Sequence, residues 1–272
     1  MAKAADKRNN IAINVGGELP FAVSEAYKTV RTNLLFSLAS LGQKTVVVSS
    51  PLPAEGKSVT CANLAIALAQ TSAKVMLIDG DLRRPTQHKL FGVDNTKGLS
   101  NMLAGFESVA DSVKRNVYNN LDLVTAGALP PNPSELLGSK NMEVFVKKME
   151  EYYDYILIDS PPVNIVTDAV VLSKNSAGLM MVVRSQQTSV DDLHSAISTI
   201  KAAKSNVLGV VVSDVDRRLK SSYYGNYKRG KYYYYEDEYG YGYGYGYGSQ
   251  HPRERKRRAG MTDDKTDNKA EQ

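Results

Sequence analysis

The sequence has little cysteine and no long apolar run. Its 272 residues contain a single cysteine, Cys61, so no disulfide can form within the chain. We interpret this thiol as a small buried apolar side chain, with a reactive thiol as the less favoured alternative. No apolar segment approaches the roughly 20 residues that a membrane-spanning helix needs, and residues 1–10 lack the apolar stretch of a secretory signal. We therefore expect a cytoplasmic protein.

Residues 1–216 also lack an excess of charge of either sign. They hold 21 Lys and Arg against 21 Asp and Glu, whereas residues 217–272 hold 13 against 8, so the net charge of +5 belongs to the C-terminal part. A surface that binds nucleic acid normally carries a basic face. The balance argues against nucleic acid as a partner of residues 1–216, although a local basic patch remains compatible with it.

The motif that organises the chain lies between a predicted strand, Thr45–Val48, and a predicted helix, Val59–Gln70. It reads SPLPAEGKS from Ser50 to Ser58. A strand, a glycine turn that ends in Lys-Ser and a helix are typical of a phosphate-binding P-loop, whose backbone N–H groups point at phosphate oxygens. Pro51 replaces the usual first glycine. The alternative is an ordinary strand–loop–helix connection with an incidental Gly-Lys-Ser.

The P-loop interpretation assigns a role to each of its residues. Lys57 would reach the β- and γ-phosphate oxygens, and the hydroxyl group of Ser58 would take a position on Mg²⁺. The ligands that we expect from the P-loop alone are therefore a nucleoside di- or triphosphate and Mg²⁺. The other predicted nucleotide contacts in this stretch are Pro53, Ala54, Glu55, Gly56 and Val59.

A second predicted strand, Lys74–Ile78, ends in a pair of carboxylates. Asp79 and Asp81 follow it, and Arg83 comes directly after them. Because ligands of parallel α/β sheets bind at the carboxyl ends of the strands, both carboxylates can approach a metal–phosphate site there. The sequence thus predicts Asp79 and Asp81 as metal ligands and Arg83 as a nucleotide contact, with a solvated Asp-Gly turn as the alternative.

A third predicted strand, Tyr155–Ile158, runs into a single carboxylate, Asp159. This is the Walker B pattern, in which the aspartate holds Mg²⁺, usually through a water molecule. The pattern is weak by itself, since many buried strands end in Asp. Beside the two preceding motifs it predicts a third ligand of the same metal–nucleotide centre.

Short apolar runs alternate with helical patterns along residues 20–216, which predicts one α/β domain. The fold class is a P-loop NTPase-like, mostly parallel β-sheet with helices on both faces, preceded by a flexible lead over residues 1–19. Strands are predicted at 45–48, 74–78, 121–124, 155–158, 178–183 and 207–212, and helices at 21–39, 59–70, 134–137, 141–152 and 190–203.

The composition changes sharply after residue 216. Twelve of the seventeen tyrosines lie in Tyr223–Tyr247, and no aliphatic residue occurs between Leu219 and Ala259. Such a segment cannot bury enough surface to offset its chain entropy, so residues 217–272 are predicted to be disordered.

This segment is either a sticky low-complexity segment that associates with itself or stacks on bases, or a substrate arm for the nucleotide site. The basic run Arg253–Arg258 reads as solvated, or as a contact with anionic lipid.

Together, Walker A (Ser50–Ser58), Walker A′ (Leu77–Pro85), Walker B (Ile156–Pro162) and the tyrosine cluster resemble the bacterial tyrosine kinases of capsular and exopolysaccharide synthesis. The resemblance covers about residues 20–216 and the tail. It implies an ATP-dependent protein-tyrosine kinase in which the catalytic groups are Lys57, Asp79, Asp81 and Asp159, one of the first two aspartates acting as base. It also implies autophosphorylation in trans of Tyr223, Tyr224, Tyr227, Tyr232, Tyr233, Tyr234, Tyr235, Tyr239, Tyr241, Tyr243, Tyr245 and Tyr247.

The resemblance further implies partners. These are other copies of the chain in a homo-oligomeric ring, a transmembrane polysaccharide co-polymerase that activates the kinase at the inner face of the membrane, and a cognate tyrosine phosphatase. Glu25, Arg31 and Asn33, in the predicted helix 21–39, resemble the ring-forming motif, although spacing alone favours an ordinary solvated face. The chain departs from the family at Ser213-Asp214, where members often carry Asn as an adenine contact.

The alternative function is a positioning or partitioning ATPase of the MinD/ParA type. Those relatives carry a lysine near the start of the P-loop, at the position of Leu52. The absence of that lysine and the presence of the tyrosine-rich tail both favour the kinase. A scaffold that binds nucleotide without transferring phosphate is a third possibility.

Overall fold

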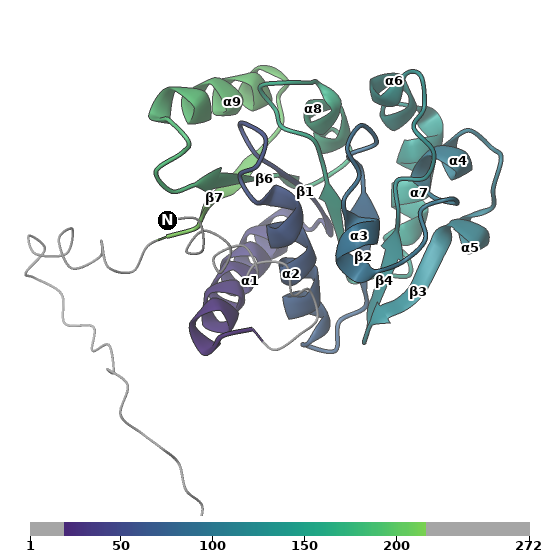
Figure 1. The fold of residues 1–272 in the computed structure, drawn as a ribbon, viewed down its shortest axis with the longest axis horizontal. Coiled ribbons are helices and arrows are strands. Elements are labelled where there is room, and N and C mark those ends of the chain that lie inside the picture. The colour runs from purple at the N-terminus through teal and green to yellow at the C-terminus, as the bar shows by residue number, and fades with distance from the viewer. Residues whose placement is uncertain (1–18, 216–272) are drawn as a thin grey trace, which may run out of the picture. The chain divides into compact units, whose positions relative to one another are not determined.

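The computed structural model describes residues 19–215 (Figure 1). The predicted lead and the predicted tail therefore lie, but for Leu19, outside the described residues, and their boundaries stay predictions. Within residues 19–215, no helix has the length and apolar character needed to cross a membrane.

Helices and strands alternate along the described part of the chain. The helices are α1 (Phe21–Leu41), α2 (Lys57–Ala69), α3 (Gln87–Phe91), α4 (Leu99–Leu103), α5 (Val109–Ser112), α6 (Pro133–Leu137), α7 (Lys140–Met149), α8 (Asp168–Ser173) and α9 (Val190–Ala202). The strands are β1 (Thr45–Ser49), β2 (Val75–Asp79), β3 (Val113–Tyr118), β4 (Leu121–Val124), β5 (Tyr155–Asp159), β6 (Gly178–Arg184) and β7 (Val207–Ser213).

The seven strands of the described residues form one sheet in the order β3-β4-β2-β5-β1-β6-β7. All neighbours are parallel except β3 and β4, which run antiparallel. The register places Asp79 beside Asp159, and Val48 on the other side of Asp159. The carboxyl ends of β1, β2 and β5 therefore meet at the centre of one sheet edge, and the predicted fold class is confirmed.

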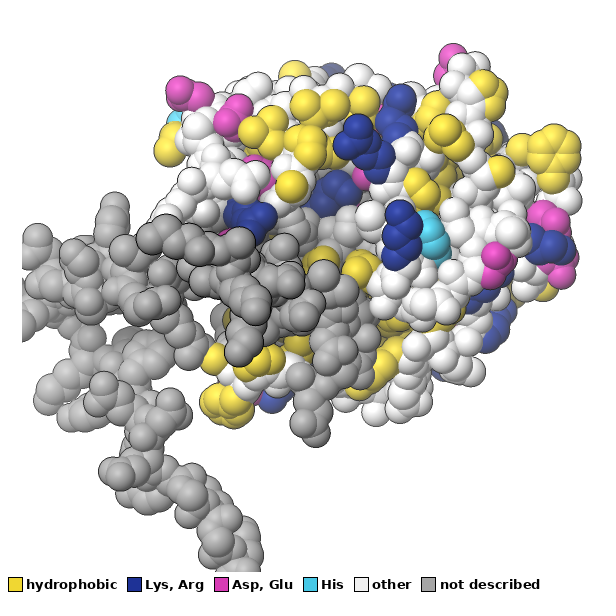
Figure 2. All heavy atoms as spheres, viewed as in Figure 1, with side chains coloured by type: hydrophobic (Ala, Val, Ile, Leu, Met, Phe, Trp, Pro, Cys, Tyr) yellow, Lys and Arg dark blue, Asp and Glu magenta, His cyan; other side chains and the backbone are white. Residues whose placement is uncertain are grey.

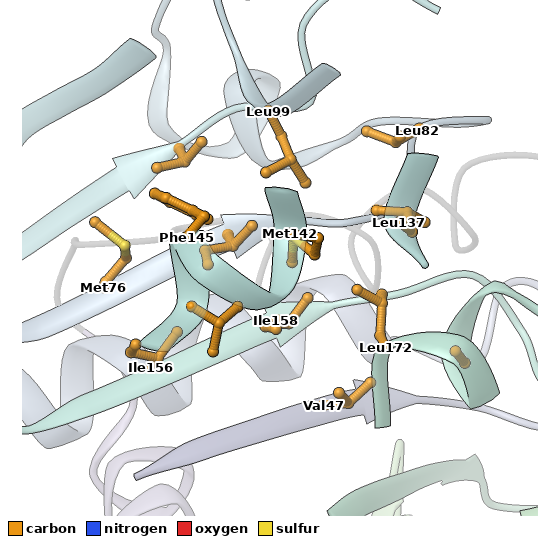
Figure 3. Close-up of a cluster of buried hydrophobic side chains, with 14 of the residues drawn as sticks. Val47, Met76, Leu82, Leu99, Leu137, Met142, Phe145, Ile156, Ile158 and Leu172 are labelled. Carbon is orange, nitrogen blue, oxygen red and sulfur yellow. The ribbon is translucent and has the colours of Figure 1, made fainter. Parts of the chain in front are cut away.

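Alternate side chains of the buried strands pack into two separate cores, because successive residues of a strand point to opposite faces. One core joins α1 and α2 to side chains such as Val46, Val48 and Leu77. The other joins the helices of the opposite face to Val47 and Ile158, among others. Figure 3 shows this second core, in which Met142 and Phe145 of α7 face the strands that carry Met76, Ile156 and Ile158.

The sequence prediction missed one strand. β3 lies at the edge of the sheet, and only Val113 at its start is buried, so it lacks the apolar run by which the other strands are identified. Asn116 in this strand and Asn120 after it have positive φ, which makes the connection to β4 irregular. The short helices α3, α4, α5 and α8 were missed too, because four to six residues are too few to display a helical period.

Candidate active site

The phosphate loop (Ser50–Ser58) connects the central strand β1 to α2, as predicted. Gly56 at the N-cap of α2 has φ 87°, a left-handed conformation that glycine adopts without steric cost. Ala54, two residues earlier, has φ 63°, which is uncommon for a residue with a side chain. The turn therefore delivers the chain into the N-terminus of a 13-residue helix, where free N–H groups favour an anion.

Hydrogen bonds of Glu55 hold the phosphate loop against other parts of the domain. Its carboxylate is completely buried; one oxygen accepts a hydrogen bond from the backbone N–H of Leu52 at 2.8 Å, and the other accepts one from the hydroxyl group of Thr188. The hydroxyl group of Ser213 donates to the backbone carbonyl of Glu55 at 2.8 Å. The side chain of Glu55 thus points into the protein, so any contact with nucleotide falls to its backbone.

The position at which the sequence departs from the family lies beside this loop. Asp214 follows β7 and forms an ion pair with Arg184 at 2.9 Å, and Arg184 also donates to the carbonyl of Ala54 at 3.2 Å. The ends of β6 and β7 are therefore linked directly to the phosphate loop. A base bound next to the loop would meet this ion pair.

Lys57 brings the three motifs together. Its Nζ lies 3.0 Å from Oδ2 of Asp81, 3.1 Å from Oγ of Ser58 and 3.8 Å from Oδ1 of Asp159. Burial disfavours the charged amine, but the carboxylates of Asp159 and Asp81 outweigh burial and raise the pKa of Lys57. Lys57 is therefore a buried cation with a carboxylate on either side, at the first turn of α2.

Asp79 shapes the Walker A′ loop. Its Oδ2 accepts hydrogen bonds from the backbone N–H groups of Thr86 at 3.0 Å and Gln87 at 2.9 Å, and its Oδ1 accepts one from the N–H of Asp81 at 3.3 Å. Burial, with the nearby charge of Asp159 added to it, raises the pKa of Asp79 to about 8. Both oxygens of this carboxylate are thus engaged by the backbone of its own loop.

Gln87 is a site residue that the sequence prediction missed. Its side-chain amide donates to Oδ2 of Asp159 at 2.8 Å and to the backbone carbonyl of Ser58 at 3.1 Å. Oδ1 of Asp159 is completely buried and accepts no hydrogen bond. Gln87 therefore connects Walker A to Walker B by hydrogen bonds, and Oδ1 of Asp159 can still accept one. No motif marks Gln87 in the sequence.

The residues present fit a magnesium ion that is held mainly by a nucleotide. Within residues 19–215, no three His, Cys, Asp or Glu side chains gather closely enough to hold a metal by themselves. Mg²⁺ in phosphate-transfer sites usually takes one or two protein ligands together with phosphates and water. The buried Oδ1 of Asp159 lies 3.8 Å from Nζ of Lys57 and accepts no hydrogen bond from the described residues, so a water molecule on such an ion would satisfy it.

The side chain of Arg83 is paired with a carboxylate of its own chain. Its Nε lies 2.8 Å from Oδ2 of Asp168, and its Nη2 lies 3.1 Å from Oδ1 of Asp168 and 3.2 Å from Oγ of Ser134. Asp168 is completely buried at the start of α8. Figure 2 shows basic side chains gathered in the middle of the face drawn there. The role of Arg83 as a nucleotide contact stays a prediction.

The residues predicted for the ring interface lie on α1. Glu25 forms an ion pair with Lys28 at 2.7 Å, and Arg31 donates to the carbonyl of Ala67 near the end of α2 at 2.7 Å. Glu25 and Arg31 thus each have a partner within the described chain, and their role in a ring interface stays a prediction. Asn33 is exposed. The twelve predicted phosphoacceptor tyrosines lie outside the described residues.

A family model described as an AAA domain matches residues 43–210. The chain is 37% identical over 205 residues to the putative tyrosine-protein kinase CapB of Staphylococcus aureus, covering 75% of this chain and 90% of that protein. It is 39% identical over 204 residues to the tyrosine-protein kinase YwqD of Bacillus subtilis, covering 75% and 86%. These matches confirm the predicted resemblance.

Solved structures agree with the sequence relatives. The kinase domain of the Escherichia coli tyrosine kinase ETK has a TM-score of 0.70 and 28% identity, covering 80% of this chain and 87% of that one. The septum site-determining protein MinD of Pyrococcus horikoshii, in complex with Mg-ADP, has a TM-score of 0.55 and 23% identity, covering 64% and 72%, and shares the fold alone. The chain therefore belongs to the bacterial tyrosine-protein kinases of capsule and exopolysaccharide biosynthesis, the P-loop transferases that bind ATP and phosphorylate protein tyrosine.

Proposed function

We propose that the kinase transfers the γ-phosphoryl group of Mg-ATP to tyrosines of Tyr223–Tyr247 in another copy of the chain. The observation that carries this proposal is the convergence on Lys57 of a phosphate loop and two carboxylates, Asp81 and Asp159, within 4 Å of its Nζ. Phosphoryl transfer needs alignment and charge neutralisation more than covalent help from the protein, and this set of groups can supply both.

Each group has a distinct task in the proposed reaction. Lys57 and the N–H groups at the start of α2 hold the β- and γ-phosphates. Ser58 and Asp159 would hold Mg²⁺, directly or through water, and the ion would supply positive charge to the same phosphates. The tyrosine oxygen forms a bond to the γ-phosphorus, the bond from that phosphorus to the β–γ bridging oxygen breaks, and ADP leaves.

Asp81 is the better candidate for the base that receives the tyrosine proton. Both oxygens of Asp79 already accept backbone hydrogen bonds, whereas Oδ2 of Asp81 is paired with Lys57 at 3.0 Å. Phosphates that draw Lys57 toward them would release this oxygen at the centre where the tyrosine hydroxyl arrives. Asp79 would then hold the loop in place, and the proton would pass to Asp81.

The assembly and the partners are part of the proposal. Copies would meet through α1 in a ring, so that one copy presents its tyrosines to the next, and Asn33 together with the exposed Phe21 and Phe36 supports α1 as a contact surface. A transmembrane polysaccharide co-polymerase would activate the ring at the inner face of the membrane. A cognate tyrosine phosphatase would reverse the modification.

Mixing two variants tests transfer between copies. Lys57→Met with an intact tyrosine cluster serves as acceptor, and a chain with all twelve cluster tyrosines changed to Phe serves as donor. With Mg-ATP, phosphotyrosine should accumulate on the Lys57→Met chain only when the donor is present. Labelling that needs Lys57 and the tyrosines in one chain would contradict transfer in trans. ATP hydrolysis without any phosphotyrosine would favour a switch ATPase.

A further inference from the structure

A second cavity lies at the opposite edge of the sheet from the ATP site. It has a volume of about 510 Å³ and is lined by residues that precede or begin β2, β4 and β5, and by parts of β3 and α7. Lys74, in its wall, comes just before β2, and Asp79 ends the same strand, so the two sites are separated by roughly 16 Å of strand. Pockets for small ligands commonly measure about 300–1,000 Å³.

A polar cluster of the buried Tyr153 and Asp122 with the exposed Arg115 lines part of this cavity. The hydroxyl group of Tyr153 donates to Oδ2 of Asp122 at 2.6 Å, and Nη1 of Arg115 donates to the same oxygen at 2.7 Å and to the Tyr153 oxygen at 2.8 Å. The N–H of Asn116 donates to the other oxygen of Asp122 at 2.8 Å. The charge of Asp122 is thus satisfied inside the cluster, which also fixes the position of the Arg115 guanidinium.

Two lysines in the rest of the wall form no ion pair with the described residues, although Asp154 accepts a hydrogen bond from the backbone N–H of Lys74 at 2.8 Å. Within residues 19–215, neither Lys74 nor Lys148 forms an ion pair, and Nε and Nη2 of Arg115 donate no hydrogen bond. Three cations and one carboxylate therefore line the cavity, and because Arg115 is paired with Asp122, the net charge of the lining comes from Lys74 and Lys148. Met149 and the ring of Tyr152 add apolar surface beside them. The chemistry suits an anion attached to a flat apolar group.

We propose that this cavity binds the phosphotyrosine side chain, the product of the kinase itself. The phosphate would bind between the guanidinium of Arg115 and the amines of Lys74 and Lys148, with the aromatic ring against Met149. Charged donors of this kind form the strong hydrogen bonds by which phosphate groups are recognised.

The source to which we assign this ligand is the C-terminal segment of another copy, and that assignment rests on the proposed function. Glycines alternate with tyrosines from Tyr239 to Gly248, so a modified side chain there would enter a pocket with little steric hindrance from its neighbours. A phosphorylated segment bound at this edge would be held away from the ATP site, which would leave that site open to the next tyrosine.

A peptide titration tests the cavity directly. The full-length Lys57→Met chain, which cannot phosphorylate its own tyrosines, is titrated with a fluorescent Gly-Tyr-Gly-Tyr-Gly peptide whose first tyrosine is phosphorylated, and with the unphosphorylated peptide. Only the phosphopeptide should bind. Adding Lys148→Ala should weaken binding about tenfold, as expected for the loss of one charge-assisted hydrogen bond.

The neighbouring lysine of the same helix is the matched control. Lys147 is 69% exposed and paired with Glu143, so Lys147→Ala should leave the affinity for the phosphopeptide unchanged. Equal binding of both peptides, or equal affinity of the Lys148→Ala and Lys147→Ala chains, would overturn the proposal. Inorganic phosphate that competes as well as phenyl phosphate would also overturn it, because the ring would then contribute nothing.

A second experiment separates this inference from the proposed function. Phosphorylated wild-type chain is mixed with tagged Lys57→Met chain, with and without Lys148→Ala, and the amount retained on the tag is compared. Retention that falls with Lys148→Ala supports the C-terminal segment as source. If the peptide binds but the chain is not retained, the C-terminal segment is not the source of the ligand, and the cavity is still a phosphotyrosine site. If labelling in trans is normal but the peptide does not bind, the proposed phosphotyrosine site is wrong and the proposed function stands.

Discussion

The side-chain amide of Gln87 lies 2.8 Å from Oδ2 of Asp159 and holds one oxygen of this buried carboxylate, while the other oxygen accepts no hydrogen bond. The same amide donates to the carbonyl of Ser58. A single neutral side chain thus orients the Walker B aspartate relative to the phosphate loop. The other oxygen, Oδ1, lies 3.8 Å from Nζ of Lys57 and keeps its capacity to accept a hydrogen bond.

Replacing Gln87 should therefore lower both stability and activity. Gln87→Ala leaves Oδ2 of Asp159 buried without a donor, which should cost about 1–3 kcal/mol of unfolding free energy. The rate of tyrosine phosphorylation should also fall because Asp159 loses its orientation. Urea unfolding and a phosphorylation time course measure the two effects. Gln70→Ala, at an exposed position after α2, is the control that should change neither.

The carboxylate of Glu55 should matter for nucleotide affinity although it points away from the nucleotide. Glu55→Ala leaves the N–H of Leu52 and the hydroxyl group of Thr188 without their acceptor, so the phosphate loop should lose its fixed shape. We expect ATP binding to weaken about tenfold, measured by titration with a fluorescent ATP analogue.

A double-mutant cycle shows whether this contact is the cause. Thr188→Val should weaken ATP binding less than Glu55→Ala, and the double variant should be no worse than Glu55→Ala alone, with a coupling energy of about 0.5–3 kcal/mol. Strictly additive effects would mean that the two residues act independently, and the proposed anchoring of the loop would then be wrong.

The two aspartates of Walker A′ should fail in different ways. Asp81→Asn should abolish tyrosine phosphorylation because it removes the base, and it should still bind Mg-ATP because Lys57 and the N–H groups of the phosphate loop remain. It should also lower the melting temperature of the nucleotide-free chain, since Lys57 loses the carboxylate that lies 3.0 Å away. Asp79→Asn should lower the melting temperature, since an amide cannot accept all three backbone hydrogen bonds on equal terms. Calorimetry and phosphotyrosine detection on both variants decide between these roles, and phosphorylation that survives Asp81→Asn but not Asp79→Asn would make Asp79 the base.

Gly80 provides a test of the packing between Walker A′ and Walker B. A Cβ atom at this position would lie 2.8 Å from the backbone oxygen of Asp159 and 2.9 Å from Cγ2 of Ile158. Gly80→Ala should therefore destabilise the fold by about 1–3 kcal/mol through overpacking. Gly209→Ala in β7 meets no atom within 4 Å and is the matched control in the same thermal unfolding experiment. Equal melting temperatures for the two variants would contradict the close approach of the strands.

Much of the fold could be predicted because its strands are apolar runs buried on both faces. The five strands of this kind, and β7 at the edge of the sheet with its apolar sequence, were placed within a residue or two. Each of the three motifs ends a strand or begins a helix as predicted. β3 was missed because only one of its six residues is buried. A pattern of hydrophobicity reports burial, and an edge strand has little of it.

The separate roles of the site residues were harder to predict from the sequence than the fold. Asp79 and Asp81 are the same residue type two positions apart. Only the structure shows that Asp79 accepts backbone hydrogen bonds whereas Asp81 is paired with Lys57. Gln87 carries no motif, because its role depends on contacts with Ser58 and Asp159 that lie far away in the sequence. The ion pair of Arg83 with Asp168 could not be predicted from the motif either, and the role of Arg83 as a nucleotide contact stays a prediction.

Mass spectrometry of the full chain produced in cells tests the central claim most directly. Wild-type protein and the Lys57→Met variant are purified without added phosphatase, and phosphate is mapped on every tyrosine. The account predicts phosphate on Tyr223–Tyr247 of the wild-type chain and none on the variant. Equal phosphorylation of the two proteins, or a wild-type cluster without phosphate after incubation with Mg-ATP, would contradict it.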